Sequence, residues 1–174
     1  KTEHQWLWRL SSAHGSKGVL GDVGIHILDY ATFIAGADPA EVSCRLTTFQ
    51  KAAGGRIGDY TLDANDSFTM HLALTNGAVG TVSATRFATG HLNDLRLRLY
   101  GDKGGLDVLF EKGESRLNAC LGADIATGTW ETVATPEVPT IYQLFAAAIH
   151  GTAAGQPNFA RGAALQQVLD LAEA

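Results

Sequence analysis

The sequence predicts an α+β fold, in which helices pack on one face of a mostly antiparallel, open β-sheet of about six strands. Three observations support this class. Apolar residues recur at helical spacing over 18–36, alternating patterns joined by short turns occupy 41–133, and the helical period returns after Pro139. Because short hairpin turns join antiparallel neighbours, the strands belong to a largely antiparallel sheet with helices on its apolar face.

The N-terminal segment, residues 1–17, holds an aromatic cluster and a loop. Trp6, Trp8 and Arg9 form the cluster, which we interpret as an incoming strand. Residues 11–17 follow as a loop that contains Gly15 and leads into the first helix.

The first helix is predicted over Gly18 to Gly36. Gly36 follows the last apolar position, where glycine commonly ends a helix. Asp22 and His26 are four residues apart, so a helix places them one turn apart on the same face. The predicted apolar face consists of Leu20, Val23, Ile27, Tyr30, Ala31 and Ile34.

The middle of the chain carries the strand signals. Residues 52–60 are glycine-rich and are predicted to be a loop. Asn76-Gly77 lies between two alternating runs, which is the strongest short-range signal for a β-hairpin. Alternation predicts strands over 41–49, 67–74, 78–86, 95–100 and 106–110, with weaker ones near 116–120 and 130–133.

The C-terminal part returns to helical spacing. One helix is predicted from about Tyr142 to Ile149, and another from about Ala160 to the end. The abrupt start at Lys1 and the end of the chain inside a helical pattern indicate a piece of a longer protein. We expect residues 1–174 to form a single domain, since this length suits one sizeable core.

Composition excludes several classes of function. The net charge of −5 and the isoelectric point near 5.6 argue against a surface for nucleic acid or for an anionic membrane. No apolar run approaches the about 18 residues of a membrane span, and no leader pattern is visible. Cys44 and Cys120 are too few for a disulfide framework or a metal knuckle, so we expect free thiols in a cytoplasmic protein.

The chain shows no complete nucleotide site of its own. It contains no P-loop, and no Gly-x-Gly-x-x-Gly follows a strand. Gly18, Gly21 and Gly24 are spaced by threes and lack the preceding strand that such a fingerprint requires.

Several stretches together resemble one family. Trp8-Arg9, residues 18–26 and Asp29 resemble the C-terminal domain of the glucose–fructose oxidoreductase / inositol dehydrogenase (Gfo/Idh/MocA) family. Each match is weak alone, but the matches follow the right order over nearly the whole chain. Further stretches similar to the family are residues 80–93, 100–104 and 159–162.

The resemblance implies one half of a two-domain oxidoreductase. The family's N-terminal Rossmann domain binds NAD or NADP and carries a catalytic lysine in a Glu-Lys-Pro motif, and both are absent from this chain. The C-terminal domain supplies the substrate pocket and an open sheet for assembly, here a homodimer or homotetramer. The isolated chain is therefore expected to bind no cofactor and to be inactive. Ser16-Lys17-Gly18 replaces the consecutive glycines of many members, which affects the shape of this loop.

The resemblance carries the family's Asp-x-x-x-His motif onto Asp22 and His26. His26 would act as acid/base toward a substrate hydroxyl, because imidazoles ordinarily titrate near neutral pH. Asp22 would orient the imidazole or bind a neighbouring hydroxyl. On spacing alone, a first-turn carboxylate favoured by the helix dipole and a packed histidine are the stronger interpretation; the resemblance reverses this order. No metal site is predicted, since Asp22, His26 and Asp29 lack a further ligand.

Other polar groups are candidates for substrate binding. Arg86, His91 and Asn93 fall where a strand meets a loop, and they suit a polyhydroxylated or acidic substrate as well as a solvated turn. Trp8 and Arg9 are further candidates to line the pocket, although an aromatic residue near a strand start is more often core.

The predicted function is thus the substrate-binding half of an NAD(P)-dependent oxidoreductase for a sugar, polyol or related hydroxy compound. Two alternatives stay open. In one, the chain is a non-enzymatic assembly or binding module that uses its sheet face. In the other, it is a small-molecule sensor with a degenerate dehydrogenase fold.

Overall fold

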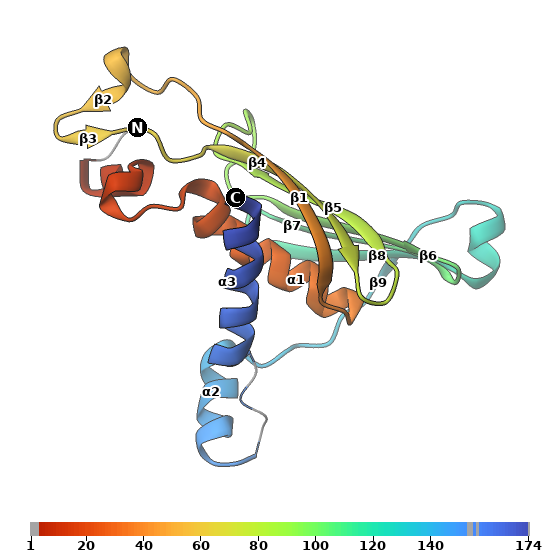
Figure 1. Ribbon diagram of the computed structural model, residues 1–174. Helices are drawn as coiled ribbons and strands as arrows, with labels where there is room; N and C mark the ends of the chain where they lie inside the picture. Colours follow the sequence, from red (N-terminus) through yellow and green to blue (C-terminus); the bar gives the residue numbers. More distant parts are fainter. Residues whose placement is uncertain (1–3, 153–154, 156, 174) are drawn as a thin grey trace. The chain divides into compact units, whose positions relative to one another are not determined.

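Residues 4–152, 155 and 157–173 are described by the structure, a computed structural model (Figure 1). The chain divides into two units, one of Lys1–Phe87 with Pro157–Ala174 and one of Ala88–Gln156. The predicted α+β class is confirmed, since helices accompany antiparallel sheets. The described residues form nine strands rather than about six, because weakly patterned segments also pair.

The N-terminal segment is helical where a strand was expected. The 3-10 helix His4–Leu10 (η1) replaces the predicted strand, which was wrong, and a second 3-10 helix, Ser12–His14 (η2), lies in the segment predicted as a loop. Leu7 is buried, whereas Trp6 and Trp8 on either side of it are 47% and 44% exposed. This segment therefore packs on the rest of the unit through Leu7 and not through the tryptophans, as a short helical turn can.

The first helix contains a wide turn. Residues 18–35 are helical, with a π-helical turn at Leu20–Gly24 (η3) and a regular α-helix at Ile25–Ala35 (α1). Gly36 ends α1 in the left-handed region at φ 62°, as predicted. The fully buried stripe is Leu20, Gly24, Leu28 and Thr32. Val23, assigned to the apolar face, is instead exposed, because the π turn moves the buried stripe on by one residue.

The first unit contains a three-stranded antiparallel sheet, in the order β1-β4-β5 (Figure 1). The predicted hairpin is present, and Gly77 adopts φ 87° in its turn. The glycine-rich loop contains a small hairpin instead of being wholly irregular. The strands are β1 (Pro39–Thr47), β2 (Arg56–Ile57), β3 (Tyr60–Thr61), β4 (Ser67–Leu74) and β5 (Val79–Thr85).

The core of this unit lies between that sheet and two helices. α1 and α3 (Phe159–Glu173) lie side by side against the sheet (Figure 1). Each buried aliphatic or aromatic side chain contributes about 1.5–3 kcal/mol to folding. The core residues are Val19, Leu20, Leu28, Phe68, Met70, Leu72, Val82, Leu165 and Leu169.

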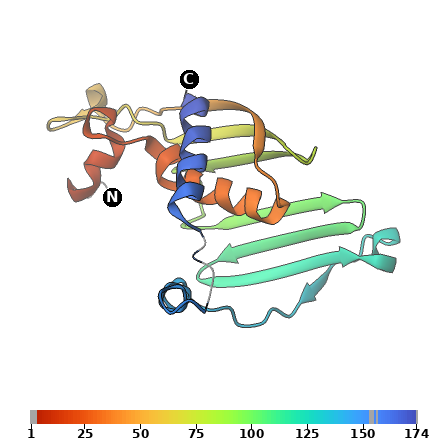
Figure 2. The same ribbon diagram turned by 60° about the horizontal axis from the view of Figure 1, so that its bottom comes forward.

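The second unit is a four-stranded antiparallel meander, in the order β6-β7-β8-β9 (Figure 2). Its helix α2 (Ile141–Ile149) begins with a capping box between Thr140 and Gln143. The strands are β6 (Leu95–Gly101), β7 (Gly104–Glu111), β8 (Glu114–Leu121) and β9 (Glu131–Val133), and the 3-10 helix Gly122–Ala126 (η5) precedes β9.

Cys44 and Cys120 are both free thiols, as predicted. Burial raises the pKa of the Cys44 thiol. In the part of the chain that the structure describes, no helix has the length and apolar content required to cross a membrane.

Candidate active site

The helix that carries Asp22 is held at its start by one remote residue, Asn65. The Asn65 side chain accepts a hydrogen bond from the Leu20 N–H at 3.0 Å and donates one to the Lys17 carbonyl at 2.8 Å. Its backbone carbonyl accepts from the Val19 N–H at 2.9 Å. A buried amide thereby satisfies the first orphan groups of the helix, as an N-cap normally does.

The glycines at positions 18, 21 and 24 are packing positions. A Cβ on Gly18 would lie 2.5 Å from Asn65, and one on Gly24 would lie 3.1 Å from the Phe68 ring. Gly18 also has φ +63°, which favours glycine. Their three-residue spacing therefore reflects close contacts and not a loop that cradles phosphate.

Ser16 links the N-terminal segment to the same helix. Its hydroxyl donates to the Arg9 carbonyl at 2.5 Å and accepts from the Gly18 N–H at 3.0 Å. The departure from consecutive glycines thus places a hydroxyl that joins Arg9 to the helix start. Lys17 points elsewhere, because its ammonium group pairs with Glu173 and lies 3.9 Å from Asp170.

Asp22 lies inside the π turn and contacts two arginines. Its Oδ2 accepts a hydrogen bond from Arg86 Nη2 at 3.1 Å and lies 3.5 Å from Arg9 Nη1. The exposed fractions of the three side chains are 31% for Asp22, 25% for Arg86 and 39% for Arg9, so the cluster is accessible to a ligand. π turns occur often at functional sites.

Two tryptophans complete this cluster. The Arg9 guanidinium lies 4.6 Å from the Trp6 ring centroid and 5.5 Å from that of Trp8, within the range of cation–π contacts. Arg86 directly follows β5, and its N–H donates to the Asp66 carbonyl at 2.9 Å. The structure therefore brings together four of the predicted site residues: Trp8, Arg9, Asp22 and Arg86.

His26 follows the π turn, in the first turn of α1, and its side chain is exposed. It forms no hydrogen bond or ion pair with the described residues, and none joins it to Asp22. The predicted orientation of the imidazole by Asp22 is thus not present here, because the arginines engage the carboxylate. An exposed imidazole is free to meet a substrate hydroxyl.

His91 and Asn93 belong to the second unit, not to the unit that holds Arg86. His91 Nδ1 hydrogen bonds to Asp94 Oδ2, and its N–H donates to the Ala88 carbonyl in a local turn. Asn93 is exposed in the same turn. Their sequence proximity to Arg86 therefore produces no shared cluster within one unit.

Asp29, which is part of the family resemblance, forms an ion pair within the fold. Its Oδ1 accepts a hydrogen bond from Arg161 Nε at 2.8 Å. Within the described ranges, no group of three or more His, Cys, Asp or Glu side chains is arranged to hold a metal ion.

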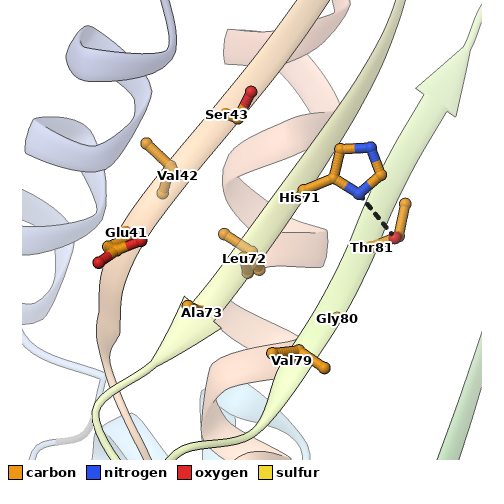
Figure 3. Close-up of a pocket in the computed structure, with 9 residues that line it drawn as sticks. All are labelled: Glu41, Val42, Ser43, His71, Leu72, Ala73, Val79, Gly80 and Thr81. Carbon is orange, nitrogen blue, oxygen red and sulfur yellow. Dashed lines mark hydrogen bonds between the residues drawn. The ribbon is translucent and has the colours of Figure 1, made fainter.

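A separate hollow lies on the outer face of the β1-β4-β5 sheet (Figure 3). Its volume is about 500 Å³, and none of the residues around Asp22 line it. His71 Nδ1 and Thr81 Oγ1 are 3.3 Å apart across two of its strands. The lining residues include Ser43, His71, Ala73, Val79, Gly80 and Thr81.

The sequence and the described fold agree with a known family. The GFO/IDH/MocA C-terminal domain matches residues 1–107. The chain belongs to this family. The matched range contains Trp8, Arg9, Asp22, His26 and Arg86.

Relatives of this Gfo/Idh/MocA chain include two curated dehydrogenases. Levoglucosan dehydrogenase of Pseudarthrobacter phenanthrenivorans is 28% identical over 119 residues, covering 60% of this chain and 30% of that protein. Inositol 2-dehydrogenase of Rhizobium meliloti is 32% identical over 91 residues, covering 52% of this chain and 26% of that protein.

Solved structures show the same fold. Levoglucosan dehydrogenase in complex with NADH and L-sorbose matches at a TM-score of 0.81 and 25% identity, over 95% of this chain and 50% of that one. An oxidoreductase domain protein from Kribbella flavida matches at a TM-score of 0.76 and 28% identity, over 95% of this chain and 51% of that one. The chain thus spans about half the length of these structures.

Sequence reasoning missed Asn65, although it organises the site. No local pattern marks this residue, because its partners Lys17 and Leu20 are more than 40 residues away in the sequence. The hint in the sequence is its position two residues before the clearest strand pattern, where a polar side chain can turn back toward a helix start.

Proposed function

We propose that this chain is the substrate-binding half of an NAD(P)-dependent oxidoreductase that acts on a sugar, polyol or related hydroxy compound. The observation that carries the proposal is the Asp22 cluster. The accessible carboxylate of Asp22 lies beside the guanidinium groups of Arg9 and Arg86. His26, four residues further along the same helix, has an exposed imidazole. Membership of the family and its dehydrogenase relatives support the same reaction class.

The residues described here do not fit a dinucleotide site of their own. Asn65 occupies the space beside Gly18, and Phe68 occupies the space beside Gly24. These glycines therefore leave no room for a pyrophosphate. We therefore assign the nicotinamide cofactor, which supplies the hydride acceptor in such enzymes, to a Rossmann domain outside this chain.

In this proposal the residues of the chain handle the proton and hold the substrate. His26 takes the proton of the reacting hydroxyl through its imidazole, since the ring is exposed and free of other hydrogen bonds among the described residues. Asp22 accepts a hydrogen bond from a neighbouring hydroxyl, and Arg86 and Arg9 hold the carboxylate in place. His91, Asn93 and Trp8 stay candidates for contacts with the substrate.

The test is turnover by the natural full-length protein with NAD and NADP on a panel of sugars and polyols, followed at the nicotinamide absorbance. We expect reduction of one cofactor, and a loss of at least about a hundredfold in kcat for His26→Ala. His150→Ala is the matched control, because His150 is exposed at the end of α2. Full activity of His26→Ala, or no turnover on the whole panel, would contradict the proposal.

A role in assembly is favoured by a different observation, the hollow on the outer sheet face. Its lining mixes apolar residues with small polar ones, and Val79 is 83% exposed, which suits contact with a second copy of the chain. We propose a homodimer or homotetramer through this face. Thr81→Arg should shift the full-length protein toward the monomer in sedimentation experiments, whereas His26→Ala should not; an unchanged oligomer for Thr81→Arg would reject the interface.

A further inference from the structure

The Asp22 cluster contains one positive charge in excess. Arg9 and Arg86 both face the same oxygen, Asp22 Oδ2, at 3.5 and 3.1 Å. Arg161, in the same unit, has the opposite charge balance, because one guanidinium contacts two carboxylates, those of Asp29 and Asp38. A surplus cation is notable in a chain with a net charge of −5.

Hydrogen-bond donors in the cluster are unused. Arg86 donates to Asp22 through Nη2 alone among its guanidinium nitrogens, within the residues that the structure describes. Arg9 Nε is buried and has no hydrogen-bond partner there. The Arg9 Nε itself has no exposed surface, so the donors available to a ligand oxygen are the remaining guanidinium nitrogens of these two partly exposed arginines.

An acceptor is unused as well. Asp22 Oδ1 accepts no hydrogen bond from the described residues, since both arginines face Oδ2. The planar fork of a guanidinium matches the two oxygens of a carboxylate, and a free carboxylate oxygen suits a hydroxyl donor. The combination fits a ligand that carries a carboxylate and a hydroxyl on neighbouring carbons.

We propose that Arg86 and Arg9 bind a carboxylate of the substrate, so that this oxidoreductase acts on a sugar acid, an aldonate or a uronate, in preference to a neutral sugar. The inference rests on the function proposed above and specifies its substrate class. Asp22 binds the adjacent hydroxyl through Oδ1, and the rings of Trp6 and Trp8 support the Arg9 guanidinium.

The experiment uses the natural full-length protein and matched substrates that differ in one group: glucose with glucuronate and gluconate, and galactose with galacturonate. We expect kcat/KM to be at least about tenfold higher for one acid than for its neutral partner, as the loss or gain of one charge-assisted hydrogen bond implies. Arg86→Gln should remove this preference by raising KM for the acid, with the KM for cofactor unchanged. Rising salt concentration should lower kcat/KM for the acidic substrate and leave that for the neutral sugar unchanged.

Control variants separate binding from folding. Arg56→Gln removes an exposed arginine of the β2-β3 hairpin that donates to Thr61, and it should leave the preference intact. If Arg86→Gln does not fold, as judged by its thermal unfolding, Arg9→Gln and Arg86→Lys provide the same comparison. Arg86→Lys should retain part of the preference, because it keeps the charge but loses the fork.

Calorimetric titration with glucuronate, gluconate and galacturonate distinguishes the two proposals. Turnover of neutral sugars without preference for acids, with Arg86→Gln affecting both alike, overturns the inference and leaves the proposed function standing. Binding of an acid that Arg86→Gln abolishes, without turnover on any substrate, supports the acid site and overturns the oxidoreductase function. A raised KM for the cofactor in Arg86→Gln overturns the inference by assigning the arginine to a cofactor phosphate.

Discussion

The buried amide of Asn65 accepts the Leu20 N–H at 3.0 Å, and so joins the start of β4 to the turn that carries Asp22. The position of the candidate site therefore depends on a contact between two residues that lie far apart in the sequence.

Asn65→Ala should destabilise the protein by about 1–3 kcal/mol, because the Leu20 N–H and the Lys17 carbonyl lose a buried partner. Urea unfolding measures the change. Asn65→Asp is the comparison variant, since it keeps the acceptor for the Leu20 N–H and replaces the donor to the Lys17 carbonyl with a charged oxygen. An unchanged free energy of unfolding for Asn65→Ala would contradict the role of this amide.

Gly18→Ala and Gly36→Ala separate steric overlap from backbone conformation. Both glycines have φ near +62°, but a Cβ meets nothing within 4 Å at Gly36 and lies 2.5 Å from Asn65 at Gly18. Gly36→Ala should cost about 1–2 kcal/mol for the left-handed conformation alone. Gly18→Ala should cost clearly more in the same unfolding experiment. A smaller loss at Gly18 would contradict the close approach of Asn65.

Arg161 joins α3 to α1 and to the turn before β1. Its guanidinium donates to Asp29 at 2.8 Å, to Asp38 at 2.6 Å and to the hydroxyl of Thr32. Arg161→Met keeps the apolar stem and should lower the free energy of unfolding by about 1–2 kcal/mol, since the contacts are partly exposed. Arg161→Lys should recover part of this loss. Stability of Arg161→Met equal to that of the parent protein would reject the link.

Asp107 on β7 should titrate at low pH. Hydrogen bonds from Arg96 at 3.0 and 2.6 Å hold the pKa of this carboxyl below its usual range. Because the folded pKa lies below the unfolded value of about 3.9, the stabilisation is present above that pH and is lost as the pH falls through the folded pKa.

Carbon NMR titration of the Asp107 carboxyl measures this effect directly. Arg96→Gln should raise the pKa toward the ordinary aspartate value. Arg116→Gln is the control, because Arg116 lowers the pKa least of the groups around Asp107. A larger rise for Arg116→Gln than for Arg96→Gln would contradict the assigned cause.

The sequence predicted the fold well where buried side chains recur at the spacing of a strand or of a helix. Phe68, Met70 and Leu72 alternate in the sequence and are buried together in β4, and Gly36 ends α1 as its chemistry requires. The N-terminal strand was wrong, since Trp6 and Trp8 resemble a strand pattern whereas Leu7 between them carries the burial.

The candidate site was predicted in part. Trp8, Arg9, Asp22 and Arg86 were each named from the sequence, and they lie in contact as one cluster. Their pairing was not foreseen, because the contact between Arg86 and Asp22 joins positions 64 residues apart. His91 was grouped with Arg86 by proximity along the chain, but a local partner, Asp94, engages it.

The π turn at Leu20–Gly24 makes the length of this helix a constraint shared by core and site. One residue more or fewer rotates the remainder of an α-helix by about 100°. A π turn holds one residue more than an α turn, so deletion of Val23 from it would leave a regular α-helix with Leu28 and Thr32 still against the sheet, and would remove the wide turn that carries Asp22. Insertions and deletions within Ile25–Ala35, a regular α-helix without such a wide turn, should therefore be excluded.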